Sequence, residues 1–300
     1  MAGKTIIQST VILTAANIIN RIFGFVYRIY MSNMIGAEGM GLYQLIMPVY
    51  SLAWSISCSG FTTTVSKITA SEKIKGEYGN MGRVLKIALT ITVSIGTVLS
   101  VLLFFGADML AMGMFNDTRL IPALKILSVS FPFMAAGSCI RGYFIGLQET
   151  TVPAVSQVFE QCVRMAVIYI LGGMFIPMGL TYACAVAVAG ILAGEFLSFL
   201  LVVFAYKGFK VKNNFVKKPS MPVDAASKLL ISMAMPLALN RITGSVLGAF
   251  ENTLLPRRLM LYGMTNSQAV SEFGKISGMA MPLIYFPSAM LVALAVSLVP

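Results

Sequence analysis

Long apolar runs separated by short polar segments dominate this chain. We expect eight of these runs to be transmembrane helices, because about 20 residues cross a ~30 Å hydrocarbon core. The predicted spans are 8–31, 42–66, 84–106, 122–145, 153–176, 179–205, 229–252 and 276–298. The strands of a β-barrel would instead be short segments of alternating polarity. The pattern therefore predicts an all-α polytopic membrane protein.

Polar residues recur at helical spacing inside the first span. Asn17, Arg21, Gly24 and Arg28 are three or four residues apart and share one helical face, with Asn20 beside them. An arginine in mid-bilayer costs at least about 2.5–3.5 kcal/mol. Two arginines on one face indicate either a water-filled cavity or ion pairs with acids on another span.

The fifth span carries a second polar stripe, with Gln157, Glu160, Gln161 and Arg164 on one face. Glu160 precedes Arg164 by four residues, an arrangement that favours an ion pair within the helix. Such a pair would let the helix insert in the membrane. Contact with a substrate explains the stripe equally well, so both interpretations stay open. Glu195 in the sixth span has no evident partner in the sequence.

A short motif occurs twice along the chain. The sequence NRIFGFV at 20–26 returns as NRITGSV at 240–246, and Met47-Pro48 in the second span matches Met281-Pro282 in the eighth. Six predicted spans separate the copies, so both cross the membrane in the same direction. Parallel repeats of this kind are a known transporter design.

The repeat predicts how the chain divides. Residues 1–206 would form a first lobe of six helices, residues 207–228 a cytoplasmic linker, and residues 229–300 the first two helices of a second, truncated lobe. A protein that is short by nature remains the alternative to truncation. The glycine pairs Gly190/Gly194 and Gly244/Gly248 are expected to be helix-packing contacts, since small residues let membrane helices approach closely.

Charge is scarce and unevenly distributed. The chain is 57% hydrophobic and 11% charged, with a net charge of +11. The connections between spans lie alternately on the two sides of the membrane. One side carries thirteen basic residues: Lys4, Lys67, Lys73, Lys75, Arg83, Lys86, Arg141, Lys207, Lys210, Lys212, Lys217, Lys218 and Lys228. The other side carries four, which are Arg119, Arg257, Arg258 and Lys275. The positive-inside rule therefore predicts a multi-pass protein of the cell membrane with a cytoplasmic N-terminus, and no nucleic-acid partner.

The charges inside the spans favour an anionic ligand. The predicted spans contain five basic residues (Arg21, Arg28, Lys125, Arg164 and Arg241) but only three acids (Glu160, Glu195 and Glu251). Guanidinium groups bind phosphate bidentately. The predicted substrate-binding residues are Asn17, Asn20, Arg21, Arg28, Gln157, Glu160, Arg164, Asn240 and Arg241.

Catalytic and metal-binding patterns are missing from the sequence. There is no histidine, and the four cysteines show neither metal-ligand nor disulfide spacing. We therefore expect no enzyme activity, no metal and no cofactor, while the need for a coupling ion stays open.

Several blocks of the sequence resemble a known family. NRIFGFVYRIYMSNMIGAEGMGLYQLIMPVY, RGYFIGLQETTVPAVSQVFEQCVRM, GEFLSFL, ENTLLPRRL and FPSAMLVALAVSLVP are similar to the stage V sporulation protein B group of polysaccharide-biosynthesis transporters. That group belongs to the multidrug/oligosaccharidyl-lipid/polysaccharide exporter superfamily, together with the lipid II flippases. Relatives have about fourteen spans, so this chain would lack the last six or so.

The resemblance implies a function. It implies two six-helix lobes around a central cavity, and flipping of undecaprenyl-pyrophosphate-linked sugars by alternating access for spore cortex or cell-wall synthesis. Partners would be the lipid-linked oligosaccharide, membrane lipid and cell-wall synthesis proteins. Arg21 matches the cavity arginines of lipid II flippases, whereas Tyr27-Arg28 departs from their Arg-acid pair. Two alternatives remain: an ion-coupled drug exporter dependent on Glu160 or Glu195, and a non-transporting scaffold for cell-wall enzymes.

Overall fold

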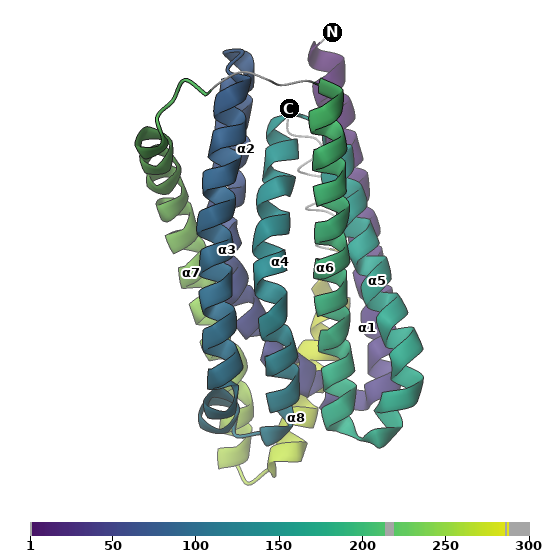
Figure 1. The fold of residues 1–300 in the computed structure, drawn as a ribbon. Helices are drawn as coiled ribbons and strands as arrows, with labels where there is room; N and C mark the ends of the chain where they lie inside the picture. The colour runs from purple at the N-terminus through teal and green to yellow at the C-terminus, as the bar shows by residue number, and fades with distance from the viewer. Residues whose placement is uncertain (1, 214–218, 286, 288–300) are drawn as a thin grey trace.

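Long helices that run side by side make up the protein (Figure 1). The computed structural model describes residues 2–213, 219–285 and 287. The α-helices are α1 (Ala2–Trp54), α2 (Gly60–Ile74), α3 (Tyr78–Leu110), α4 (Ile121–Gly146), α5 (Thr151–Phe175), α6 (Leu180–Asn213), α7 (Val223–Leu261) and α8 (Asn266–Phe273). Shorter π- or 3-10 segments are η1 (Ser55–Ser59), η2 (Ala111–Phe115), η3 (Thr118–Leu120), η4 (Ile176–Met178) and η5 (Gly274–Ala280).

Within the described residues, six helical stretches are long and apolar enough to cross a membrane. They are Thr14–Ile74, Tyr78–Phe115, Thr118–Gly146, Thr151–Met178, Leu180–Val211 and Val223–Leu261. The fold is therefore all-helical and of the multi-pass membrane type, as predicted. Each of the seven spans predicted up to residue 252 overlaps one of these stretches, and five lie wholly inside. The predicted span 8–31 begins before Thr14, and 179–205 begins one residue before Leu180.

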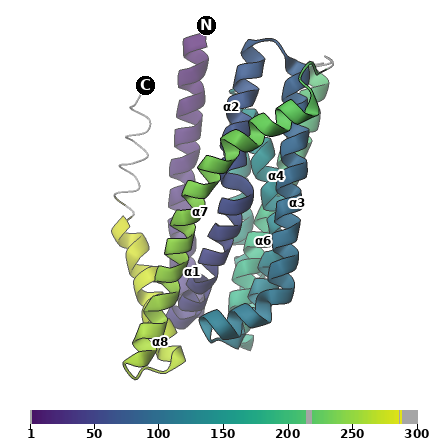
Figure 2. The same ribbon diagram turned by 90° about the vertical axis from the view of Figure 1, so that its left-hand side faces the viewer.

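The first stretch contains two of the predicted spans. Gly36 has φ 69° and ψ −175°, which ends one helical segment and begins another. Glycine adopts this backbone without steric cost because it has no Cβ. Figures 1 and 2 show the chain descending from the N-terminus and then returning along α2 to the same end. The spans predicted at 8–31 and 42–66 lie on the two sides of this reversal.

The predicted linker at 207–228 is shorter in the structure. Helix α6 continues to Asn213 and α7 already begins at Val223, so helix replaces linker at both ends. The predicted span at 276–298 is described only at 276–285 and 287, where residues 276–280 belong to η5. The rest of that predicted span lies outside the described residues.

Two buried clusters hold the helices together. One gathers residues such as Ile46, Leu124, Phe131, Val188 and Phe273 from α1, α4, α6 and α8. The other joins α2, α3 and α4 to the first turns of α7 through residues such as Val65, Leu85, Phe144 and Leu230. Helix α7 therefore packs against the preceding helices from its first turns onward (Figure 2).

Small residues allow the closest helix contacts. A Cβ added at Gly142 of α4 would lie 2.6 Å from the carbonyl oxygen of Thr62 in α2. Lipid tails are as apolar as side chains, so helices in a membrane associate through such close packing rather than through hydrophobic burial.

Candidate functional site

A network of ion pairs occupies the space between α4, α5 and α6. Arg164 pairs with Glu160 one turn earlier on α5, and its Nη2 lies 3.6 Å from Oε1 of Glu195 on α6. Arg141 of α4 completes the network, with Nη1 3.6 Å from Oε2 of Glu160. Two arginines and two glutamates thus neutralise one another inside the bundle.

Hydroxyl groups add hydrogen bonds to this network. The Tyr50 hydroxyl in α1 donates a hydrogen bond to Oε1 of Glu195 at 2.5 Å. Ser198 accepts from Nη1 of Arg141 at 3.2 Å and donates to the carbonyl of Ser156 at 3.2 Å. The Glu195 side chain is only 3% exposed. A buried carboxylate needs such partners, because desolvation penalises an unpaired charge heavily.

These contacts show what Glu160 and Arg164 of the stripe on the fifth span bind within the bundle. The interpretation of Glu160 and Arg164 as an ion pair is confirmed. Glu195, which had no partner in the sequence, binds Tyr50 and Arg164. Arg141, assigned from sequence to a cytoplasmic connection, instead joins the network inside α4. The predicted span 122–145 already contained Arg141, and this was the signal in the sequence that its side chain could lie inside the bundle.

A first polar cavity lies between α1 and the segment that starts at η5. Its volume is about 390 Å³, and its lining includes Arg21, Gly24 and Arg28 from α1 together with Met281 and Pro282. No ion pair within the described residues involves either arginine. The two positive charges of the first span therefore face a cavity rather than acidic partners.

A second polar cavity lies between α1 and α7. Its volume is about 470 Å³, and Asn240, Arg241 and Gly244 of α7 line it together with Met47 and Pro48 of α1. The Arg241 guanidinium lies 5.7 Å from the ring centre of Trp54, within the range of a cation–π contact. Arg241 also has no acidic partner among the described residues.

The two cavities are built from corresponding residues. The arginine and the glycine of each motif copy share a cavity with the Met-Pro pair of the other copy: Arg21 with Met281-Pro282, and Arg241 with Met47-Pro48. Neighbouring contacts also cross between these segments, since Gln44 donates to the Ser277 carbonyl at 2.7 Å. The sequence repeat thus corresponds to a repeat in space.

The two glycine pairs that were expected to be packing contacts have different surroundings. At Gly190 and Gly194 an added Cβ would lie 3.3 and 3.1 Å from carbonyl oxygens of α5, which confirms the expected packing. At Gly244 and Gly248 no atom of the described residues lies within 4 Å of an added Cβ, and both residues line the second polar cavity. Within the described part of the chain, the packing expected of this second pair is therefore not found.

The other predicted site residues lie in the cavities, in the ion-pair network or in neither. Asn20 Nδ2 donates to Oε1 of Gln157 at 3.4 Å, which joins α1 to α5. Asn17 is exposed on α1 and lines neither cavity. The structure therefore brings Arg21 with Arg28 and Asn240 with Arg241 into cavities, and places Glu160 and Arg164 in the ion-pair network.

Comparison with known proteins identifies the family. A family model described as polysaccharide biosynthesis protein matches residues 6–300. The chain therefore belongs to the polysaccharide biosynthesis protein family. It is 32% identical over 303 residues to stage V sporulation protein B of Bacillus subtilis (strain 168), which covers 100% of this chain and 58% of that protein. The resemblance seen in the sequence is confirmed.

Further members and structures extend the comparison. The lipid II flippase MurJ of Bacillus subtilis (strain 168) is 31% identical over 219 residues, covering 69% of this chain and 40% of that protein. The inward-facing structure of a multidrug resistance MATE family transporter of the MOP superfamily matches with a TM-score of 0.71 at 15% identity, over 95% of this chain and 64% of that one. The chain thus has a MATE-like fold and spans between 40% and 64% of these relatives.

Proposed function

We propose that the protein flips a lipid-linked oligosaccharide across the cell membrane by alternating access. The substrate is an undecaprenyl-pyrophosphate peptidoglycan precursor, used for spore cortex or cell-wall synthesis. Family membership and the likeness to stage V sporulation protein B and MurJ support this proposal. Under this proposal the described helices form one six-helix lobe and the start of a pseudo-symmetric second lobe, and the N-terminus lies in the cytoplasm.

The observation that carries the proposal is the pairing pattern of the embedded arginines. Arg141 and Arg164 are neutralised by glutamates. Arg21, Arg28 and Arg241 face cavities without acidic partners among the described residues. A cationic cavity inside a membrane protein is costly unless an anion occupies it in the working cycle. A pyrophosphate supplies that anion, since guanidinium binds phosphate bidentately.

Transport by vesicles that contain the reconstituted full-length protein tests the proposal. Each lost charge-assisted hydrogen bond is worth about 1.5–3 kcal/mol, so Arg21→Ala combined with Arg241→Ala should slow flipping of a fluorescent lipid II analogue about 100-fold or more. Arg258→Ala is the matched control, because Arg258 is exposed at the end of α7 and lines neither polar cavity. Flipping at the normal rate in the double variant would overturn the proposed site.

The same variants separate the alternatives. A scaffold would keep its partners when the cavity arginines are removed, and the wild-type protein would not flip lipid. A drug exporter was expected to depend on Glu160 or Glu195, and both carboxylates are engaged by arginines in this structure. That engagement gives the exporter alternative less support, because coupling by an acid requires a carboxylate that is free to exchange its partner.

A further inference from the structure

An apolar cavity of the described structure is lined by none of the predicted site residues. It has a volume of about 850 Å³ and lies between α1, α3 and α7. Its lining includes Leu52, Ile56, Leu103, Met109, Phe250 and Leu254. Sites for small organic molecules occupy about 300–1,000 Å³. The cavity is therefore large enough for a substantial hydrocarbon group.

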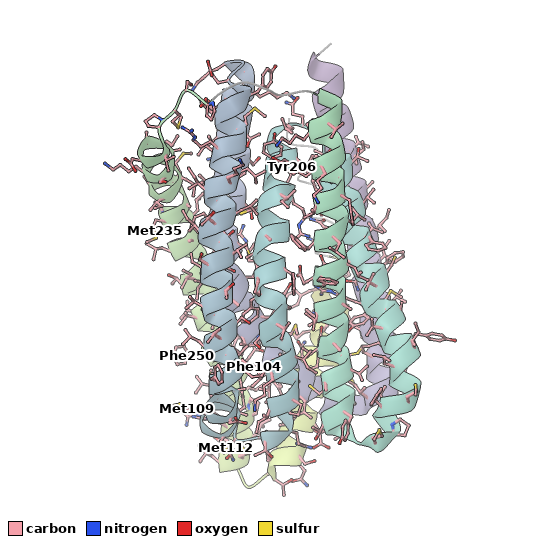
Figure 3. The ribbon with its side chains drawn as sticks, in the orientation of Figure 1. Phe104, Met109, Met112, Tyr206, Met235 and Phe250 are labelled. Atoms are coloured by element: carbon pink, nitrogen blue, oxygen red, sulfur yellow. The ribbon has the colours of Figure 1, made fainter. Side chains whose placement is uncertain are left out.

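Side chains along this region are apolar on the outside as well. Figure 3 shows Phe250 of α7 and Phe104 of α3 at the same level, with Met109 nearer the end of α3 and Met112 beyond that end, in η2. Met109 is 84% exposed and Phe250 is 59% exposed. The cavity is consequently bordered by side chains that face lipid, which suits entry of a hydrocarbon chain from the bilayer.

The apolar cavity adjoins the polar cavity of Arg241. Pro48 lines both of them. On α7, Gly248 and Asn252 line the polar cavity, while the next residues in each case, Ala249 and Thr253, line the apolar one. One compartment is cationic and the other is apolar, and a single turn of helix borders both. This combination fits an amphiphile with a negative head and a hydrocarbon tail.

The position of the cationic compartment distinguishes between amphiphiles. Arg241 lies near the middle of α7, 18 residues after Val223 and 20 before Leu261, which is about 27 and 30 Å from the two ends at ~1.5 Å per residue. An ordinary phospholipid keeps its headgroup at the membrane surface, near the ends of a spanning helix. A head at the middle of the helix therefore fits a lipid that is carried across the bilayer.

The far end of the apolar cavity offers fewer polar groups to a headgroup than the cavity of Arg241 does. Arg257 is the only charged residue among the described residues that line the apolar cavity, and its Nη2 donates to the carbonyl of Gly113 at 2.6 Å, which links α7 to η2. Arg241 lines its cavity together with the polar side chains of Gln44, Ser51 and Asn240. The head is therefore placed at Arg241.

We propose that the cavity between α1, α3 and α7 holds the polyprenyl chain of a lipid pyrophosphate whose head lies at Arg241. The inference rests on the proposed function, and it adds the location of the tail. The polyprenyl chain fills space that is otherwise open to lipid. The substrate therefore stays in contact with the hydrocarbon phase while its head occupies a polar cavity.

Filling the cavity tests the tail site. Gly106 of α3 lines the cavity, and no atom lies within 4 Å of an added Cβ. Gly106→Phe should therefore project a ring into the cavity without disturbing the backbone. Gly82→Phe is the matched control, because Gly82 is on the same helix, is equally open and does not line the cavity. Leu102→Trp, at a lining residue that is 63% exposed, fills the cavity independently.

Binding is measured with labelled undecaprenyl pyrophosphate and with geranyl pyrophosphate, using the full-length protein in nanodiscs. Burial of hydrocarbon contributes in proportion to the area removed from water, so Gly106→Phe and Leu102→Trp should weaken undecaprenyl pyrophosphate about tenfold or more. The short geranyl chain should bind as before. Arg241→Ala should weaken both probes, and Gly82→Phe neither.

Three results would overturn the inference, and they are distinguishable. Undecaprenyl pyrophosphate that binds normally to both filled variants, while Arg241→Ala still weakens it, removes the tail site and leaves the proposed function intact. Absence of binding of both probes to the unmodified protein removes the head site as well. Displacement of the probe by phosphatidylglycerol as readily as by unlabelled undecaprenyl pyrophosphate identifies the cavity as an ordinary lipid site.

Discussion

At the scale of residues, pairing distinguishes two kinds of embedded arginine. Arg141 and Arg164 lie in a network with Glu160 and Glu195. Arg241, by contrast, lines a cavity and lies over the Trp54 ring. The first kind is part of what holds α4, α5 and α6 in place. The second kind carries a charge that nothing in the described structure neutralises.

Removal of Arg164 should destabilise the fold. Its loss leaves Glu160 and Glu195 with less compensation inside the bundle. Breaking a buried pair from one side costs about 3–5 kcal/mol, so Arg164→Ala should unfold at a clearly lower temperature in thermal melts of the purified protein. Arg241→Ala is the comparison, and its melting temperature should stay close to that of the unmodified protein.

The double variant Arg164→Met with Glu160→Gln should recover part of this loss, because it removes a positive and a negative charge together. A melting temperature for Arg164→Ala equal to that of the unmodified protein, accompanied by lost transport, would instead make the network a substrate contact.

At the scale of elements, backbone contacts at glycines determine which helices can approach. Gly142 and Gly146 of α4 lie against the backbone of Thr62 and Ser66 in α2. In the same way, a Cβ added at Gly60 would meet the backbone of Ala234 in α7. The α2 region therefore contacts α4 on one side and α7 on another, each time through glycine.

Even the smallest side chain at Gly142 should loosen the contact of α2 with α4. A Cβ there would lie 2.6 Å from a carbonyl oxygen that belongs to a helix and cannot move freely. Overpacking of this kind costs about 1–3 kcal/mol, so Gly142→Ala should lower the melting temperature. Gly82→Ala is the control, since an added Cβ at Gly82 meets nothing within 4 Å.

Alanine favours a helix over glycine by about 1 kcal/mol, so Gly82→Ala should be neutral or slightly stabilising. Equal melting temperatures for the two alanine variants would show that α2 and α4 tolerate a wider separation than the structure indicates.

At the scale of the whole molecule, hydrogen bonds connect the turns at the end opposite the N-terminus (Figure 1). Asn266, at the start of α8, donates to the Asn116 carbonyl at 3.1 Å and to Oδ2 of Asp117 at 3.3 Å. Arg257 donates to the Gly113 carbonyl at 2.6 Å. These contacts join the turn after α7 to the turn after α3 and hold that end of the molecule closed.

Loss of both donors should open this end. Asn266→Ala combined with Arg257→Ala removes hydrogen bonds that each contribute about 0.5–1.5 kcal/mol, and more where the donor is charged. Spin labels at Met112 and Ser267 should show a longer and broader distance distribution in pulsed electron paramagnetic resonance. Lys275→Ala is the control, because Lys275 pairs with Glu272, which is only three residues away in the chain.

An unchanged distribution in the double variant would mean that packing of α7 and α8, rather than these hydrogen bonds, holds the end closed. The Lys275→Ala distribution should match that of the unmodified protein in either case.

The sequence by itself determined the helices, their apolar character and the repeat. Hydrophobicity and helical period are local properties, so the spans and the shared face of Arg21, Gly24 and Arg28 could be predicted from neighbouring residues. The Glu160–Arg164 pair was predictable for the same reason, since its partners are one turn apart. Family resemblance was likewise visible in several blocks of the sequence, and a family model matches residues 6–300.

Only the tertiary structure decided which charges are neutralised. Glu195 meets Tyr50, which is 145 residues away in the chain, and Arg141 meets Glu160 across two helices. Only the fold, too, placed the arginine of each motif copy in a cavity with the Met-Pro pair of the other copy. Helix periodicity specifies a face but not what that face meets. Partners of embedded charges depend on how distant helices pack, and packing follows from small-residue contacts along whole helices.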